Sequence, residues 1–147
     1  MPARQDFDVL FYGAMNERRA KVLQALKAVG LNVVTLFGSY GRERDEFIAR
    51  AKRVVNVHYY PTNIFEIVRC SYLFANGKAV VSELAPDTEI YPEVRECVVD
   101  VAYDNVAAEC ACLLGDEGRL KRQGARAREI YSEFRLDAFP RAWIADA

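Results

Sequence analysis

Short, almost uninterrupted apolar runs recur along this chain, and each is followed by a stretch with helical spacing. A run such as FDVLFYG or LNVVTLFG is too short for a buried helix and suits a strand that is buried on both faces. Parallel strands need long crossover connections, usually helices, to bring the chain back to the same end of the sheet. The runs that predict strands cover residues 7–13, 31–38, 53–58 and 78–83, with a fifth, shorter one at 97–103.

The segments between these runs carry the helical pattern. In residues 16–30, Val22, Leu26 and Val29 fall on one stripe, and Gly30 marks a stop. Strands that alternate with helices predict a single α/β domain over residues 1–147, with a Rossmann-like three-layer α/β/α fold around a parallel sheet of four to five strands. Residues 39–52 are predicted to form a polar loop followed by a short helix, and further helices are predicted at 62–77, 104–115 and 116–134. Residues 84–96 are predicted to be an irregular acidic loop.

Charge and cysteine content argue against several classes of function. The chain has 20 Lys+Arg and 21 Asp+Glu, so its net charge of −1 shows no bias toward nucleic acid or an anionic membrane. Its apolar stretches are well short of the roughly 20 residues that a spanning helix needs, and its start lacks a secretory pattern. Four cysteines and one histidine offer no zinc-site spacing. We expect a cytoplasmic protein with reduced thiols, and no metal, integral membrane segment or nucleic-acid partner.

Topology predicts where a ligand binds. In an open parallel sheet, ligands bind outside the carboxyl ends of the strands, near the point where the strand order reverses. Three segments follow predicted strands and should share that edge: the turn from Gly13 to Asn16, the turn from His58 to Asn63, and the pair Ser82 and Glu83.

The first of these turns suits a phosphate. Gly13 allows the chain to turn, and a helix that starts near Asn16 points its free amides, with partial positive charge, at this edge. Arg18 and Arg19 add guanidinium groups that can grip phosphate oxygens at two points. The alternative is that both arginines are solvated groups on a surface helix.

The second turn carries polar and aromatic side chains, and each has two interpretations. Glu66 is placed either to complete a capping box with Asn63 at the helix start, or to accept hydrogen bonds from ribose hydroxyls. His58 is either a satisfied structural histidine or a group that binds a sugar hydroxyl or acts as a base. Tyr59 and Tyr60 either stack on a base or sugar, or pack in the protein.

Three segments together resemble the carboxyl-terminal nucleotide-binding half of GT-B glycosyltransferases, and in particular the bacterial branch of spore-maturation-protein-like glycosyl transferases. The segments are DVLFYGAMNERRAKVLQALKAVG, RVVNVHYYPTNIFEIVRCSYLFANGKAVVSE and ECVVDVAYDN. The most specific part is IFEIVRCSYLFANGKAVVSE, which fits the family's apolar helix with its glutamate and following strand. The resemblance spans roughly residues 7–135 as a family-like core and leaves 136–147 as a tail without strong periodicity.

The resemblance implies a role for each matched position. In the family, the glutamate of the apolar helix holds the ribose of the nucleotide-sugar donor, so this role falls to Glu66. The family's earlier glutamate, which touches the transferred sugar, is replaced by His58, which would orient the sugar. Of the basic pair that grips the diphosphate, the first position is Ala14, which cannot do so, and Arg18 or Arg19 fills the second.

The implied function is a donor-binding domain of a glycosyltransferase in polysaccharide biosynthesis, with the nucleotide-sugar as substrate and no cofactor. A GT-B enzyme builds its cleft between two Rossmann-like domains, and this sequence has room for one. The resemblance therefore implies an amino-terminal acceptor-binding domain as a partner, in cis or in trans, for any transferase activity.

Two other functions compete with this one. The domain could be a non-catalytic interaction module whose tail, with Phe139, Trp143 and Ile144, docks on another domain. A receiver-like signalling domain would want acidic residues at the end of the first strand, whereas Asp6 and Asp8 lie at its start.

Overall fold

The computed structural model describes residues 4–59, 65, 67–113 and 115–133. Within these ranges, five strands and four helices alternate from β1 to β5, and one 3-10 turn and two further helices follow. In chain order they are β1 (Phe7–Tyr12), α1 (Glu17–Ala28), β2 (Val33–Leu36), α2 (Gly41–Arg50), β3 (Ala51–Asn56), α3 (Ile67–Ala75), β4 (Val80–Glu83), α4 (Pro92–Arg95), β5 (Val99–Val101), η1 (Tyr103–Asn105), α5 (Val106–Leu113) and α6 (Glu117–Ser132).

The strands form one sheet in the order β2-β1-β3-β4-β5, and every neighbouring pair is parallel. The register places Val9 beside Val33 on one side and beside Arg53 on the other. The chain winds outward from β1 in one direction to β2 and in the other through β3, β4 and β5, so the order reverses between β1 and β3. The predicted α/β Rossmann-like fold is confirmed.

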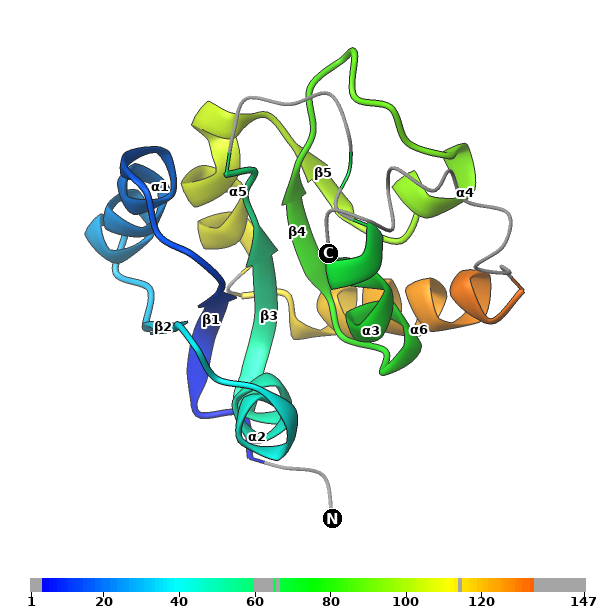
Figure 1. The fold of residues 1–147 in the computed structure, drawn as a ribbon, viewed down its shortest axis with the longest axis horizontal. Helices are drawn as coiled ribbons and strands as arrows, with labels where there is room; N and C mark the ends of the chain where they lie inside the picture. The colour runs from blue at the N-terminus through cyan, green and yellow to red at the C-terminus, as the bar shows by residue number, and fades with distance from the viewer. Residues whose placement is uncertain (1–3, 60–64, 66, 114, 134–147) are drawn as a thin grey trace.

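Helices cover both faces of the sheet and make the three layers (Figure 1). Alternate strand residues point to opposite faces, which produces two hydrophobic clusters. One cluster joins the sheet to α1 and α5, with Leu26 and Cys110 fully buried. The other joins it to α2, α3, α4 and α6, with Phe74 and Ala127 fully buried. Because both faces are covered, the ends of the strands are the places where a ligand can approach the sheet.

Helix α6 packs against the turn after α3 through two glycines. A Cβ atom placed on Gly124 would lie 2.0 Å from the carbonyl oxygen of Gly77, which no side chain tolerates. The contact brings α6 close to α3 and β4. A glycine in the middle of a helix costs stability in isolation, so its place here is explained by this close approach.

Two details differ from the sequence prediction. The segment predicted as an irregular loop contains α4, which starts at Pro92 because proline suits the first helical position. Strand β3 covers Ala51–Asn56, so it begins two residues before the strand predicted at 53–58 and directly follows α2. Within the described ranges, no helix combines the length and the apolar character needed to cross a membrane.

Candidate functional site

The three segments predicted to share one edge of the sheet do meet at the carboxyl ends of β1, β3 and β4. Asn16 on the first turn donates a hydrogen bond from Nδ2 to the carbonyl oxygen of Tyr59, at 2.6 Å. Arg18 reaches both the second and the third segment, because its Nη1 lies 3.0 Å from the carbonyl oxygen of His58 and 2.6 Å from Glu83 Oε2.

Arg18 and Glu83 form a partly buried ion pair, in which the Glu83 side chain is the more buried partner. Both terminal nitrogens of Arg18 donate to the carboxylate, which also accepts the backbone N–H of His58 at 3.0 Å. The guanidinium carbon lies 4.1 Å from the centre of the Tyr103 ring, and the Tyr103 hydroxyl donates to the carbonyl oxygen of Arg18 at 2.7 Å. This pair ties α1 to the ends of β3 and β4.

Arg19 is a buried brace, with 2% of its surface exposed. Its Nε donates to the carbonyl oxygen of Val57 at 2.9 Å, and its Nη1 donates to that of Ala14 at 2.8 Å. Because these nitrogens donate to backbone carbonyl groups, Arg19 fixes the path of the β1–α1 turn. The role of Arg18 and Arg19 in gripping a diphosphate stays a prediction.

Asn16 begins α1 as its N-cap, where its side-chain oxygen accepts the backbone N–H of Arg19 at 2.9 Å. Ser82 is fully buried between two strands: its hydroxyl accepts from Asn56 Nδ2 at 3.1 Å and donates to the carbonyl oxygen of Glu83 at 3.2 Å. Both polar groups therefore hold the edge of the sheet in shape.

Only some of the residues predicted to bind a ligand from the second turn are among those that the structure describes. Tyr60, Asn63 and Glu66 lie outside the described residues, so the ribose contact and the capping box both stay predictions. His58 is 2% exposed and is held by its backbone groups, so in this conformation its side chain is shielded from solvent.

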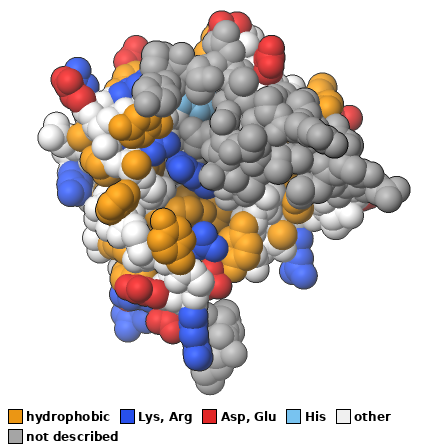
Figure 2. Space-filling view, in the orientation of Figure 1, with side chains coloured by type: hydrophobic (Ala, Val, Ile, Leu, Met, Phe, Trp, Pro, Cys, Tyr) orange, Lys and Arg blue, Asp and Glu red, His pale blue; other side chains and the backbone are white. Residues whose placement is uncertain are grey.

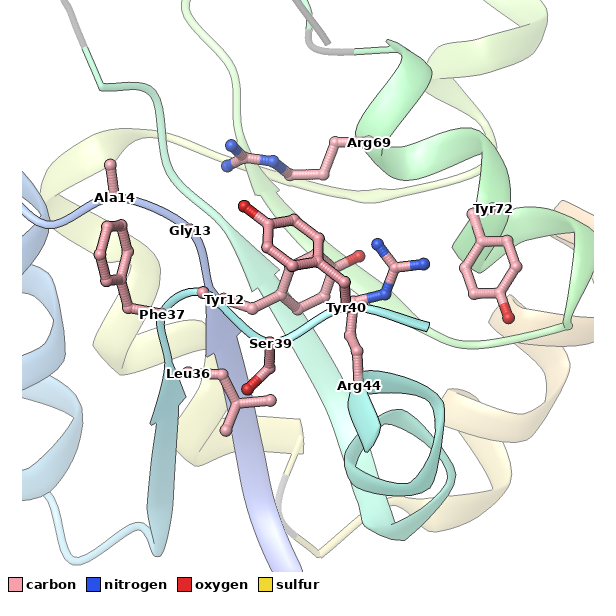
Figure 3. A pocket seen from close by; sticks show the side chains of 11 residues that line it. Tyr12, Gly13, Ala14, Leu36, Phe37, Ser39, Tyr40, Arg44, Arg69 and Tyr72 are labelled. Atoms are coloured by element: carbon pink, nitrogen blue, oxygen red, sulfur yellow. The ribbon is translucent and has the colours of Figure 1, made fainter. Parts of the chain in front are cut away.

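A pocket of about 410 Å³ opens beside the β1–α1 turn, at the carboxyl ends of β1 and β2 (Figure 3). Its volume lies in the range of small-molecule sites. It touches the β1–α1 turn at Gly13 and Ala14, so it adjoins the edge that the sequence predicted. It is lined by residues Tyr12, Gly13, Ala14, Leu36, Phe37, Gly38, Ser39, Tyr40, Arg44, Arg69 and Tyr72.

Arg69 extends from α3 across the end of the first strand, as Figure 3 shows. A Cβ atom placed on Gly13 would lie 3.2 Å from Arg69 Nη2 and 3.3 Å from Nη1. Gly13 also has a φ of +132°, a backbone conformation that other residues rarely adopt. A glycine at this position thus allows both the turn and the close approach of the guanidinium group.

Arg44 brings a second guanidinium to the pocket from the first turns of α2. Its guanidinium carbon lies 5.1 Å from the centre of the Tyr72 ring and 5.7 Å from that of Tyr12, while its Nε is 3.8 Å from Asp45 Oδ1. In Figure 2, basic groups stand among hydrophobic side chains in the middle of the visible face. The described lining holds two arginines, and the carboxylate of Asp45 beside Arg44 is not part of it.

Tyr12 and Tyr72, two residues of the pocket wall, remain protonated in ordinary buffers. Burial raises the pKa of Tyr12 to about 12. A hydrogen bond to Asp45, aided by burial, raises the pKa of Tyr72 above its usual value. Their hydroxyls therefore add no negative charge to the pocket.

Sequence reasoning missed most of this pocket, including Arg44, Arg69 and the aromatic residues Phe37 and Tyr40. One signal was available: the segment FGSYG follows the second strand, and the rule about carboxyl ends applies to that turn as well. Arg69 had no such signal, since a single arginine within an apolar helix is common. Among the residues that the structure describes, no three potential ligands gather into a metal site.

Comparison with known proteins identifies relatives without a described activity. No protein-family model matches the chain. One uncharacterized protein of Acanthamoeba polyphaga mimivirus is 40% identical over 94 residues, which are 63% of this chain and 10% of that protein. A second from the same virus is 35% identical over 79 residues, covering 52% and 11% of the two chains. A third is 32% identical over 107 residues, covering 68% and 35%.

This chain thus spans about a tenth to a third of the length of the curated relatives that it matches. In those proteins, the matching region is a part of a much longer chain.

Proposed function

We propose that this domain binds the nucleoside diphosphate part of a nucleotide-sugar and serves as the donor-binding domain of a glycosyltransferase. The observation that carries the proposal is the pocket at the carboxyl ends of β1 and β2, with Arg69 and Arg44 in its wall. It adjoins the point where the strand order reverses, which is where open α/β sheets bind their ligands.

The charges of the pocket suit a diphosphate. Guanidinium groups match phosphate oxygens in geometry and charge, and two of them face a pocket whose described lining has no carboxylate. Gly13 has no side chain, so the guanidinium group of Arg69 lies close to the β1–α1 turn, at the edge where a phosphate would bind.

The same charges suit the chemistry of sugar transfer. When the bond between the sugar and the diphosphate breaks, negative charge accumulates on the leaving phosphate, and preorganised cations stabilise it. The braces around Arg18, Arg19 and Glu83 hold the β1–α1 turn in place, so the pocket need not reorganise during the reaction. In this proposal Glu66 holds the ribose, and His58 orients the sugar, which requires its side chain to leave its shielded position.

A complete transferase would need a second domain for the acceptor. The much greater length of the mimivirus relatives is consistent with such a partner, supplied in cis or in trans. The resemblance to the GT-B family supports the same arrangement.

Calorimetric titration with UDP and GDP tests the proposal. We expect saturable binding, and Arg69→Ala should weaken it about tenfold or more because a charged hydrogen bond to phosphate is lost. Arg44→Ala should act in the same direction. Arg42→Ala is the matched control, since Arg42 lies on the same helix but its side chain is 96% exposed and is not part of the pocket wall. An absence of binding to all common nucleoside diphosphates would contradict the proposal, as would unchanged binding by both pocket variants.

A non-catalytic interaction module remains the second candidate, because Phe37 and Tyr40 expose aromatic rings beside the pocket. Exposed aromatic groups also mark protein interfaces. The two functions separate in the same titration, since an interaction module without a nucleotide site would give no heat with any nucleoside diphosphate.

A further inference from the structure

We infer that this pocket recognises its ligand through the diphosphate and accepts different nucleobases, which stack on Phe37 and Tyr40. This inference rests on the proposed function and specifies its substrate class. It predicts a site that selects nucleoside diphosphates over other ligands but discriminates little between uracil, guanine and adenine.

The first support is the exposure of two large aromatic side chains at the pocket. Phe37 is 80% exposed and Tyr40 is 77% exposed, the highest values among the large hydrophobic residues that the structure describes as exposed. Both line the pocket and both come from the loop between β2 and α2, as Figure 3 shows. A flat apolar ring held in water next to a cationic pocket is suited to stack on a base whose phosphates reach the arginines.

The second support is the backbone that carries these rings. Gly38 and Gly41 have φ values of +72° and +59°, and a Cβ atom placed on either would meet no heavy atom within 4 Å. The loop is therefore not closely packed at these two glycines. Such a loop can set its rings against a purine or a pyrimidine without displacing packed neighbours.

The third support concerns the groups that could form hydrogen bonds with the edge of a base. Strong selection between bases needs fixed hydrogen-bonding partners, which reject a wrong base by leaving buried groups unpaired. Between Phe37 and Tyr40, the described lining offers the Ser39 hydroxyl and the backbone of a glycine-flanked loop. Stacking uses the face of the ring, which every base has, so it is tolerant of base identity.

Calorimetric titrations with UDP, GDP, ADP, inorganic pyrophosphate and uridine test this inference. We expect the three nucleotides to bind with Kd values within about fivefold of one another, and pyrophosphate to bind about tenfold more weakly because stacking is lost. Uridine, which lacks the phosphates, should bind far more weakly than UDP.

Single substitutions show which side chains stack on the base and which bind the phosphates. Phe37→Ala or Tyr40→Ala should weaken each nucleotide about tenfold and leave pyrophosphate binding unchanged, whereas Phe37→Trp should retain nucleotide binding. Both residues are exposed, so their replacement should leave the fold intact, and circular dichroism checks this. Arg69→Ala should weaken nucleotides and pyrophosphate alike.

The outcomes separate the inference from the proposed function. If one nucleotide binds more than twentyfold more tightly than the others, or if Phe37→Ala and Tyr40→Ala leave nucleotide binding unchanged, the inference is overturned while nucleotide binding stands. If neither the nucleotides nor pyrophosphate bind, both the inference and the proposed function are overturned.

Discussion

The guanidinium group of Arg69 lies against the Cα atom of Gly13, so close that a methyl group on Gly13 would be 3.2 Å from Nη2 and 3.3 Å from Nη1. The two residues are far apart in the sequence, one at the end of β1 and the other in α3. Their contact joins the turn after the first strand to the wall of the pocket and places a positive charge at the edge of the sheet.

Replacement of Gly13 should disturb both the turn and the pocket. Gly13→Ala forces an L side chain into a φ of +132° and pushes against Arg69. We expect a loss of about 1–3 kcal/mol in the free energy of unfolding, measured by urea denaturation, and about tenfold weaker binding of UDP. Gly30→Ala is the matched control: its φ is +90° with nothing within 4 Å, so it should cost stability and leave nucleotide binding unchanged. Equal nucleotide affinity in Gly13→Ala and wild type would show that the position of Arg69 does not matter.

Removal of the negative charge at Glu83 should destabilise the fold. Glu83→Gln leaves the guanidinium of Arg18 beside a neutral group at a partly buried site. We expect a loss of about 2–4 kcal/mol in the free energy of unfolding, because breaking one partner of a buried pair leaves an uncompensated charge.

The exposed pair between Asp6 and Arg50 provides the comparison for Glu83, since both of its side chains are about 40% exposed. Asp6→Asn should change the free energy of unfolding far less, because solvent screens exposed pairs. Similar losses in the free energy of unfolding for the two variants would mean that the pair of Arg18 and Glu83 stabilises the fold no more than an exposed pair does.

The contact between α6 and the turn after α3 should be intolerant of any side chain. Gly124→Ala places a methyl group 2.0 Å from the carbonyl oxygen of Gly77, so the backbones must separate. We expect a loss of about 1–3 kcal/mol in the free energy of unfolding, although alanine is the better helix former by roughly 1 kcal/mol. Gly115→Ala is the control, because nothing lies within 4 Å of its Cβ position. A stabilised Gly124→Ala variant would contradict the close approach of the two backbones.

Stability should fall at alkaline pH. Burial raises the pKa of Tyr12 to about 12 from 10, so the unfolded chain loses this proton before the folded one does. The stabilisation is fully present below pH 10 and is lost as the pH rises toward 12, with a limit of about 2–3 kcal/mol for a shift of two pKa units. Buried Cys97 and Cys110, with pKa values raised to about 12 and about 11, act in the same direction from pH 9 upward.

Urea denaturation of wild type and Tyr12→Phe at pH 7, 9 and 10.5 measures this effect. Tyr12→Phe should reduce the fall in the free energy of unfolding above pH 9, and the cysteines account for the slope that remains. An identical pH profile for the two proteins would show that Tyr12 titrates at its ordinary pKa in the folded state.

The apolar runs were sufficient to predict the fold, because the period of buried side chains reports directly whether a segment is a strand or a helix. The rule about carboxyl ends then brought Asn16, His58 and Glu83 to the same edge of the sheet, as the hydrogen bonds of Arg18 and Asn16 show. These predictions need only the order of the elements along the chain.

The direction of the charged side chains could not be predicted in this way. The guanidinium groups of Arg18 and Arg19 bind Glu83 and backbone carbonyl groups of neighbouring turns, whereas Arg44 and Arg69 line the pocket. The contact of Arg18 and Arg19 with a diphosphate stays a prediction. An arginine binds whichever acceptor comes within its reach, and that acceptor belongs to a distant segment brought there by the packing of helices on the sheet. The residue order of this chain thus specifies its layers and the edge of the sheet where the three predicted segments meet. The partner of each charged side chain follows from contacts that exist only once the chain has folded.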